Sequence, residues 1–136
     1  MTMTVRQDHA SSIPSSDANE PRRLLTLRVF SITYEADGIY SFDLRDPFGG
    51  TLPPFTAGAH IDVVLPNGIQ RSYSLTNSQD ERRRYAIGVA RDANSRGGSA
   101  FMCETLRVGQ LIQVAKPSNT FALFEQAPFS VLIAGG

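Results

Sequence analysis

Residues 60–76 read His60-Ile-Asp-Val-Val-Leu-Pro-Asn-Gly-Ile-Gln-Arg-Ser-Tyr-Ser-Leu-Thr76. Two strand-like runs, 60–65 and 70–76, flank the turn-forming Pro66-Asn67-Gly68. Other short runs rich in β-forming residues, several of them alternating apolar with polar positions, lie at 24–31, 40–45, 84–91 and 110–115. The sequence therefore predicts six short strands separated by turns and polar loops.

Only one segment has helical character, and it covers residues 99–106. Gly97-Gly98 precedes it, Ser99 is the expected N-cap, and Gly109 ends it. Met102 and Leu106 are four residues apart and are expected to face the core. Many short strands with one late helix predict a small antiparallel barrel with a helical plug, because closing a sheet removes its exposed edges.

The two ends of the chain differ from this pattern. Residues 1–22 contain no aromatic residue and no apolar periodicity, so we expect a flexible N-terminal tail. The barrel is assigned to residues 23–127. Residues 131–134 form a continuous apolar run followed by Gly135-Gly136, which is typical of a strand buried on both faces in a parallel α/β sheet. Residues 128–136 are therefore expected to begin a second, truncated domain.

The composition excludes several classes of function. The 136 residues are 41% hydrophobic and 19% charged, which is typical of one globular domain. Thirteen basic residues balance thirteen acidic ones, so no overall field favours nucleic acid or a membrane. The single cysteine, Cys103, excludes an internal disulfide and a four-cysteine cluster. With no secretory or membrane-spanning segment in the sequence, we expect a cytoplasmic protein. We expect no metal site, because the two histidines are far apart in the sequence and belong to no cluster of ligand residues.

Neutrality overall hides a local excess of positive charge. Between residues 71 and 96 there are six basic residues and three acidic ones. Arg71-Ser72-Tyr73-Ser74 lies on a predicted strand, where alternation places Arg71 and Tyr73 on one face. Such a pair suits a ligand with a ring and a phosphate. Packing of Tyr73 in the barrel beside a solvated Arg71 is the other interpretation.

A second candidate element is Arg96-Gly97-Gly98-Ser99, directly before the predicted helix. Glycines at a helix start let backbone N–H groups approach an anion, and the helix N-terminus adds partial positive charge. A simple tight turn is the alternative. Together, the strand and the turn describe a site for a mononucleotide-like ligand.

These motifs resemble, in order and spacing, the flavin-binding domain of the ferredoxin–NADP reductase superfamily. The similarity covers about residues 24–136 and is greatest to the phthalate dioxygenase reductase and vanillate O-demethylase reductase branch. It is carried by residues 71–77, the strand-like run 85–92, the turn 96–99, and Leu132-Ile-Ala-Gly-Gly136.

The resemblance implies an all-β fold, a six-stranded antiparallel Greek-key barrel with one capping helix, followed by an α/β NAD-binding domain and a [2Fe–2S] domain. It implies FMN as cofactor rather than FAD, with NADH and [2Fe–2S] used only by the full-length parent. The expected activity is NADH-dependent electron transfer through FMN to an oxygenase partner. This fragment, lacking the NAD-binding and ferredoxin domains, is not expected to react efficiently with NADH by itself.

The same resemblance implies roles for individual residues. Arg71 would bind the FMN phosphate, Tyr73 would stack on the isoalloxazine, and Ser74 would approach its N5 edge. Tyr73 and Ser74 are thus the expected catalytic residues. The remaining cofactor contacts would come from the neighbouring strand residue, the backbone of the pyrimidine-binding strand and the phosphate turn: Ser72, Gly88, Val89, Ala90, Arg96, Gly97, Gly98 and Ser99. Family members often have Lys at the position of Ala90, which a backbone contact would tolerate.

Other residues are interpreted as structural. His60 is expected to be a hydrogen-bonded structural histidine, and Cys103 a small buried apolar residue. Arg82-Arg83-Arg84 is expected at a solvated loop tip, where it could also meet an acidic electron-transfer partner. The competing functional class is a non-enzymatic OB-like barrel that binds nucleic acid through Tyr73, Phe101 and the arginines. The neutral charge of the chain disfavours that class.

Overall fold

The computed structural model describes residues 23–94, 96–131 and 133 of the 136-residue chain. The expected N-terminal tail, residues 1–22, lies outside this part. Six strands form as predicted: β1 (Leu24–Ala36), β2 (Ile39–Arg45), β3 (His60–Val64), β4 (Gln70–Ser74), β5 (Tyr85–Ala90) and β6 (Leu111–Ala115). Their boundaries are close to those expected except in β1, which continues beyond residue 31 to Ala36.

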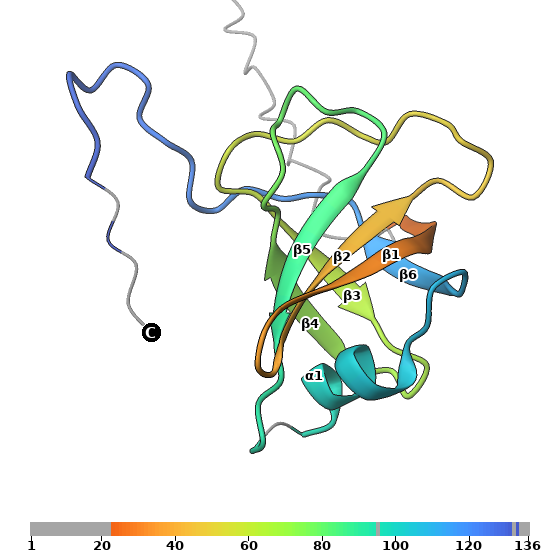
Figure 1. The fold of residues 1–136 in the computed structure, drawn as a ribbon. Helices are drawn as coiled ribbons and strands as arrows, with labels where there is room; N and C mark the ends of the chain where they lie inside the picture. The colour runs from red at the N-terminus through yellow and green to blue at the C-terminus, as the bar shows by residue number, and fades with distance from the viewer. Residues whose placement is uncertain (1–22, 95, 132, 134–136) are drawn as a thin grey trace, which may run out of the picture.

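All strand pairs are antiparallel, and the strand order is β4-β3-β6-β1-β2-β5. Placing β6 between β1 and β3 interleaves distant segments of the chain, as in a Greek key. A bridge between Leu75 and Ile87 joins the two outer strands, so the sheet closes into a barrel (Figure 1). The predicted fold class is confirmed.

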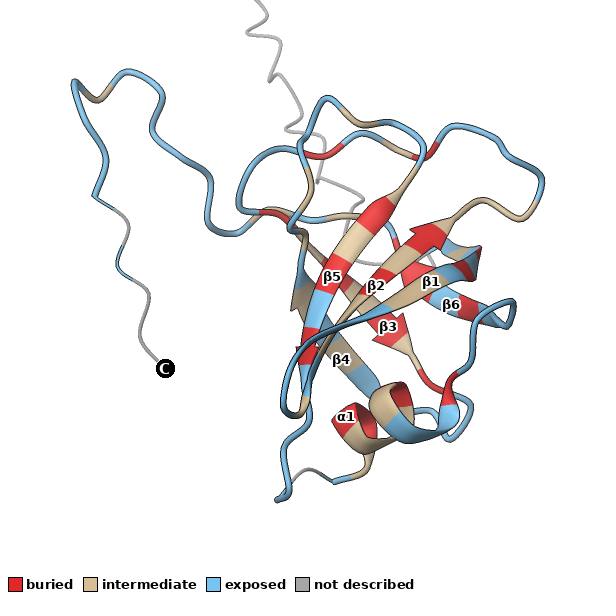
Figure 2. Ribbon diagram, in the orientation of Figure 1, coloured by how far each residue is buried: buried red, intermediate tan, exposed pale blue. Residues whose placement is uncertain are grey.

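Figure 2 shows buried positions recurring along the strands, and the buried side chains form one core cluster to which loop and helical residues also contribute. Strand β5 shows the alternation clearly, since Tyr85, Ile87 and Val89 are buried while Gly88 and Ala90 are exposed. Burial of these apolar side chains is the main force that stabilises the barrel. The largest fully buried side chains are Tyr85, Phe42, Leu27, Leu44, Ile61, Ile87 and Met102.

The helical segment covers one end of the barrel (Figure 1) but differs from the predicted helix. It consists of one α-helical turn, α1 (Gly98–Ala100), followed by a π-helix, η2 (Phe101–Thr105). Met102 and Leu106 do face the core, with exposures of 0% and 3%. Met102 lies within the π-helix and Leu106 directly follows it, and both side chains are buried. The amide of Leu106 donates to the Phe101 carbonyl oxygen at 3.0 Å, which closes that turn.

The N-cap prediction is wrong. Gly97 is the N-cap, with a φ of 94°, and no side chain caps the helix. Ser99 lies inside the first turn and is buried, and its Oγ accepts a hydrogen bond from the Asp92 amide at 3.0 Å. The hydroxyl therefore ties the loop after β5 to the helix.

The segment after β6 leaves the barrel in an extended path (Figure 1). Val131 and Ile133, the two described residues of the apolar run, are exposed and lie in no strand. A strand needs a neighbour for its backbone hydrogen bonds, and the described residues offer none here. The other positions of the expected strand, 132 and 134, lie outside the described residues. Within those residues, no helix has the length and apolar character needed to cross a bilayer.

Candidate functional site

The side chain of Arg71 links β4 to the start of α1. A Cβ atom added to Gly98 would lie only 2.7 Å from Nε and 2.8 Å from Cγ of Arg71. Glycine at position 98 therefore permits this close approach. Gly97 adds the left-handed backbone conformation that starts the helix. The structure thus brings the predicted strand and the predicted glycine turn into contact.

The charge of Arg71 is not neutralised by a neighbouring carboxylate. Its guanidinium donates one hydrogen bond, from Nη1 to the carbonyl oxygen of Gln70 at 2.8 Å. In the part of the chain that the structure describes, Arg71 forms no ion pair. A partly exposed guanidinium with unused donors beside a glycine turn is suited to bind an anion.

Tyr73 lies two residues further along β4, on the same face as Arg71. It is half-buried and packs against the core cluster. Burial is the main cause that raises the pKa of its phenol above 10. Cys103 raises this pKa slightly further, and Arg71 lowers it slightly. The phenol is neutral at physiological pH, so the residue offers a partly exposed aromatic ring next to a free cation.

Ser72 and Ser74 lie on the opposite face of β4. The Ser72 hydroxyl donates to Asp62 Oδ1 at 2.5 Å. Both serines line a hollow of about 440 Å³ together with Gly58, His60, Thr120 and Phe121. Strand alternation thus separates Ser74 from Tyr73, and the structure does not place the two side chains together.

The edge of β5 that faces β4 is unpaired at residues 88–90, the residues expected to contact the pyrimidine ring of the flavin. The segment after β4 meets β5 at two places. Thr76 N–H donates to the Ala86 carbonyl oxygen at 2.9 Å, and Leu75 forms a bridge with Ile87, the next residue of β5. Beyond that bridge, residues 88–90 pair only with β2 among the described residues. A Cβ added to Gly88 would meet nothing within 4 Å. A flat ligand can therefore approach the backbone of this strand.

Val89 and Ala90 differ in what they can offer. The Val89 side chain is fully buried, so a ligand could meet only its backbone. Ala90 is exposed and pairs with Ile39 of β2.

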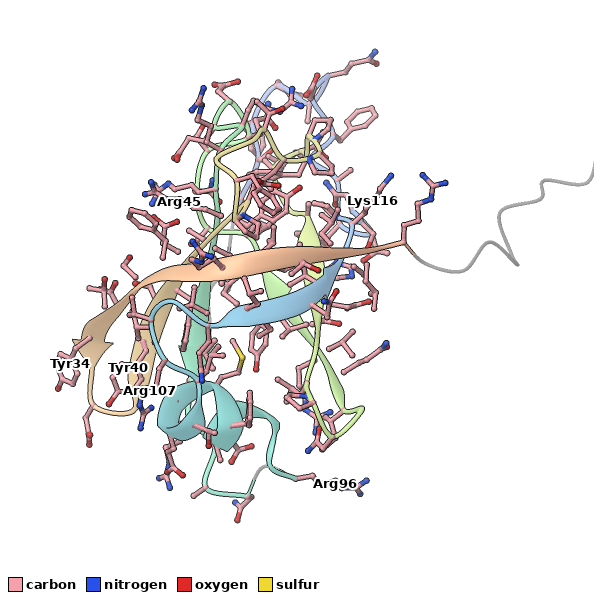
Figure 3. The ribbon with its side chains drawn as sticks, turned by 90° about the vertical axis from the view of Figure 1, so that its right-hand side faces the viewer. Tyr34, Tyr40, Arg45, Arg96, Arg107 and Lys116 are labelled. Carbon is pink, nitrogen blue, oxygen red and sulfur yellow. The ribbon has the colours of Figure 1, made fainter. Side chains whose placement is uncertain are left out.

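Arg96 precedes the glycine turn in the chain. It is exposed, and Figure 3 shows its side chain extending away from the barrel. Because α1 is only three residues long, the partial positive charge of a long helix is absent here. Positive charge at this turn therefore comes from arginine side chains, of which Arg71 is the one in contact with Gly98.

Two further features were not found from the sequence. The amide side chain of Asn77 bridges to β5, accepting from Ala86 N–H at 2.9 Å and donating to the Arg84 carbonyl oxygen at 3.0 Å. Arg91, directly after β5, forms an ion pair with Glu104 of the π-helix. Asn77 lies in the polar stretch after β4, and only the pairing of β4 with β5 reveals its role.

The residues interpreted as structural have mixed outcomes. His60 is structural, because its Nε2 lies 3.0 Å from Ser118 Oγ and its backbone pairs with the same residue. Cys103 is only partly buried, contrary to expectation, although it packs against the core cluster. Arg83 is exposed as expected, but Arg84 is held in ion pairs by Glu81 and Asp43. The described residues contain no group of His, Cys, Asp or Glu able to hold a metal ion.

Comparisons with known proteins identify relatives among the reductase components of oxygenase systems and related reductases. No model of a protein family matches the chain. It is 57% identical over 116 residues to the tetrachlorobenzoquinone reductase of Sphingobium chlorophenolicum, which covers 85% of this chain and 36% of that protein. It is 48% identical over 101 residues to a vanillate O-demethylase oxidoreductase of a Pseudomonas strain, covering 74% of this chain and 32% of the relative.

A solved structure agrees with the sequence matches. The solved structure of phthalate dioxygenase reductase, described as a modular structure for electron transfer from pyridine nucleotides to [2Fe–2S], superposes with a TM-score of 0.74 at 42% identity. The match covers 85% of this chain and 35% of that one. The chain belongs to the phthalate dioxygenase reductase and vanillate O-demethylase reductase family. It corresponds to the flavin-binding domain of these reductases and spans about a third of the length of the curated relatives it matches.

Membership of this reductase family makes flavin binding the expected use of the site. The contact between Arg71 and Gly98 lies at the end of the barrel that the helical segment covers.

Proposed function

We propose that this chain binds FMN through Arg71, Tyr73 and the 97–99 turn, and that it is the flavin module of an NADH-dependent electron-transfer reductase. The observation that carries the proposal is the contact of Arg71 with Gly98. It places an unneutralised guanidinium at a glycine turn, two residues from a half-buried aromatic ring. These are the two groups that a phosphorylated ring compound needs.

The residues present fit FMN. Gly98 has no room for a side chain beside Arg71, and the space over Gly88 is open. One guanidinium contacts the turn, which suits the single terminal phosphate of FMN better than the pyrophosphate of FAD. Ser99 accepts a hydrogen bond from Asp92, so its own hydroxyl hydrogen is free to be donated to a phosphate oxygen.

Each residue has a distinct role in the proposal. Arg71 binds the phosphate, Tyr73 packs on the ring, and the backbone of residues 88–90 contacts the pyrimidine edge. Ser74, on the other face of β4, is proposed to lie near the reactive edge of the ring. Arg96 closes on the phosphate from its exposed position, and Gly97 shapes the turn. When bound, the flavin accepts two electrons from a hydride donor and releases them singly.

The proposal also concerns the whole reductase, of which this chain would be one part. NADH would be the electron source and a [2Fe–2S] centre the first acceptor, each held by a further domain. Residues 23–127 would form the flavin domain and residues 128–136 the beginning of the next. The names of the relatives favour an oxygenase component as partner, and one of them favours a quinone as acceptor.

Titration of the purified chain with FMN, FAD and riboflavin tests the proposal. We expect saturable quenching of FMN fluorescence, tighter binding of FMN than of riboflavin, and FMN as the flavin that mass spectrometry identifies after release. Equal affinity for FMN and riboflavin would contradict the phosphate role of Arg71. Absence of flavin binding by the folded chain would overturn the proposal.

A further inference from the structure

A second hollow lies at the opposite end of β2 from the proposed flavin site. It has a volume of about 260 Å³ and is lined by residues that include Arg28, Phe30, Arg45, Asp46, Pro47 and Arg83. Figure 3 shows Arg45 at the end of the barrel away from the helical segment, whereas Arg96 and Arg107 lie beside that segment. The hollow is therefore separate from the contact of Arg71 with Gly98.

Two of its arginines are directly opposed in the sheet. Arg28 of β1 and Arg45 of β2 are cross-strand partners. Like charges in directly opposed positions destabilise a β-sheet. Asp43 pairs with Arg45, but no carboxylate in the described residues forms an ion pair with Arg28, so the arrangement leaves the charge of Arg28 unpaired.

The carboxylates near these arginines serve other contacts. Asp43 accepts two hydrogen bonds from Arg45, at 2.9 and 2.8 Å, and also pairs with Arg84 at 3.6 Å. Asp46 Oδ1 accepts from the amides of Phe48 and Gly50 and so shapes the loop after β2. Within the described residues, Arg28 and Arg83 have no ion pair. Arg28 and Arg83 thus bring positive charge to the hollow that no ion pair among the described residues neutralises.

An aromatic side chain forms one wall. The register of β1 against β2 shifts between Val29 and Ser31, so Phe30 is the extra residue of a β-bulge. Bulges re-aim side chains, and they are common beside functional sites. Here the bulge leaves Phe30 53% exposed, with the guanidinium of Arg45 3.6 Å above its ring. Pro47 adds a second apolar surface.

We propose that this hollow binds a small aromatic carboxylate, with its ring against Phe30 and Pro47 and its carboxylate between Arg28 and Arg83. A guanidinium binds a planar carboxylate through two parallel hydrogen bonds, and an aromatic ring packs well on another. The volume admits a single-ring ligand and is too small for a flavin. The site is independent of FMN, and its failure would leave the flavin proposal unaffected.

Nuclear magnetic resonance titration of the full chain with sodium benzoate tests the site. We expect saturable shifts of the amides at residues 28–30, 45–50 and 83, with residues 97–99 unchanged. Arg28→Gln, Arg83→Gln and Phe30→Ala should each weaken benzoate by about three- to tenfold. Arg107→Gln, at the other end of the barrel, is the matched control and should leave the affinity unchanged.

The stability of the variants separates binding from folding. Arg28→Gln removes a like-charge contact, so its melting temperature should be equal to or above that of the parent chain while benzoate binding falls. A lower melting temperature together with unchanged binding would overturn the assignment of Arg28. Flavin affinity is measured in parallel and should not change in any of these variants.

Comparison ligands define the specificity. Acetate supplies the charge without a ring, benzyl alcohol the ring without a charge, and inorganic phosphate a different anion. The proposal requires benzoate to bind more tightly than all three. Equal binding of acetate or phosphate would overturn it in favour of a general anion surface. Binding of a poly-glutamate peptide without binding of benzoate would overturn it in favour of an acidic protein partner.

Discussion

The two ends of the barrel each combine an arginine with an aromatic ring, but they use the arginine differently. At the helix end, Arg71 has no ion pair in the described part of the chain and lies against Gly98, beside the half-buried Tyr73. At the bulge end, Arg45 lies over the exposed Phe30, and Asp43 neutralises it through two hydrogen bonds.

The difference shows that the neighbours of an arginine decide its availability for a ligand. A bidentate carboxylate uses the donors that an anion would need, so Arg45 is a structural residue that holds Phe30 in place. Arg71 keeps its donors. At the bulge end the charge available to a ligand comes from Arg28 and Arg83 instead.

The helix end depends on Met102, which anchors the π-helix in the core with no exposed surface. Met102→Ala should lower the free energy of unfolding by about 2–5 kcal/mol, because it leaves a cavity. Phe48→Ala at the bulge end is the matched control. Phe48 is 97% exposed, so its truncation should change stability by less than about 0.5 kcal/mol. Urea unfolding of the three proteins measures both values, and similar losses would contradict the packing described.

The availability of Arg71 is tested by ligand affinity. Arg71→Ala should weaken FMN by roughly tenfold to a hundredfold, because hydrogen bonds to charged groups contribute about 1.5–3 kcal/mol. Riboflavin, without the phosphate, should lose little affinity. Arg45→Ala should leave both affinities unchanged. Fluorescence titrations of the two variants with the two ligands decide the matter, and equal losses for FMN and riboflavin with Arg71→Ala would assign that residue to the fold.

The sequence predicted the strands well because alternation and turn residues are local signals. It also predicted that Arg71 and Tyr73 share a face, which follows from strand geometry alone. It could not predict that Ser99 accepts from Asp92, that the helix widens into a π-turn at Phe101, or that Arg28 opposes Arg45. These features depend on register and on contacts between segments distant in sequence, which no local pattern records.

The bulge end should be sensitive to alkaline pH through Tyr85. This residue pairs with Leu44 of β2, is 1% exposed, and donates its hydroxyl hydrogen to the Pro53 carbonyl oxygen at 2.5 Å. Burial is the main cause that raises the pKa of Tyr85 to about 12. The unfolded phenol loses its proton near pH 10, whereas the folded phenol keeps it. Stability from this group is therefore complete below pH 10 and is lost as the pH rises toward 12.

The size of this loss should be roughly 2 kcal/mol, since each pH unit in that window changes stability by about 1.4 kcal/mol. Urea unfolding at pH 9 and pH 11.5 measures it. Tyr85→Phe cannot ionise, so its stability should fall less over the same range, although it starts lower. A parallel decline in both proteins would assign the alkaline loss to other groups.

The smallest expected effect concerns the ion pairs at the two ends. Arg91 and Glu104 are 47% and 52% exposed, whereas Asp43, which serves both Arg45 and Arg84, is 11% exposed. Exposed pairs contribute little, so Glu104→Gln should cost less than about 1 kcal/mol, and 1 M salt should remove most of that difference. Asp43→Asn should cost more, because it weakens two pairs in a less solvated position. If the Glu104 variant loses more stability than the Asp43 variant, the ion pair at the helix end is the stronger constraint. In that case the bulge end, where Asp43 neutralises Arg45, would not be the end that depends more on ion pairs.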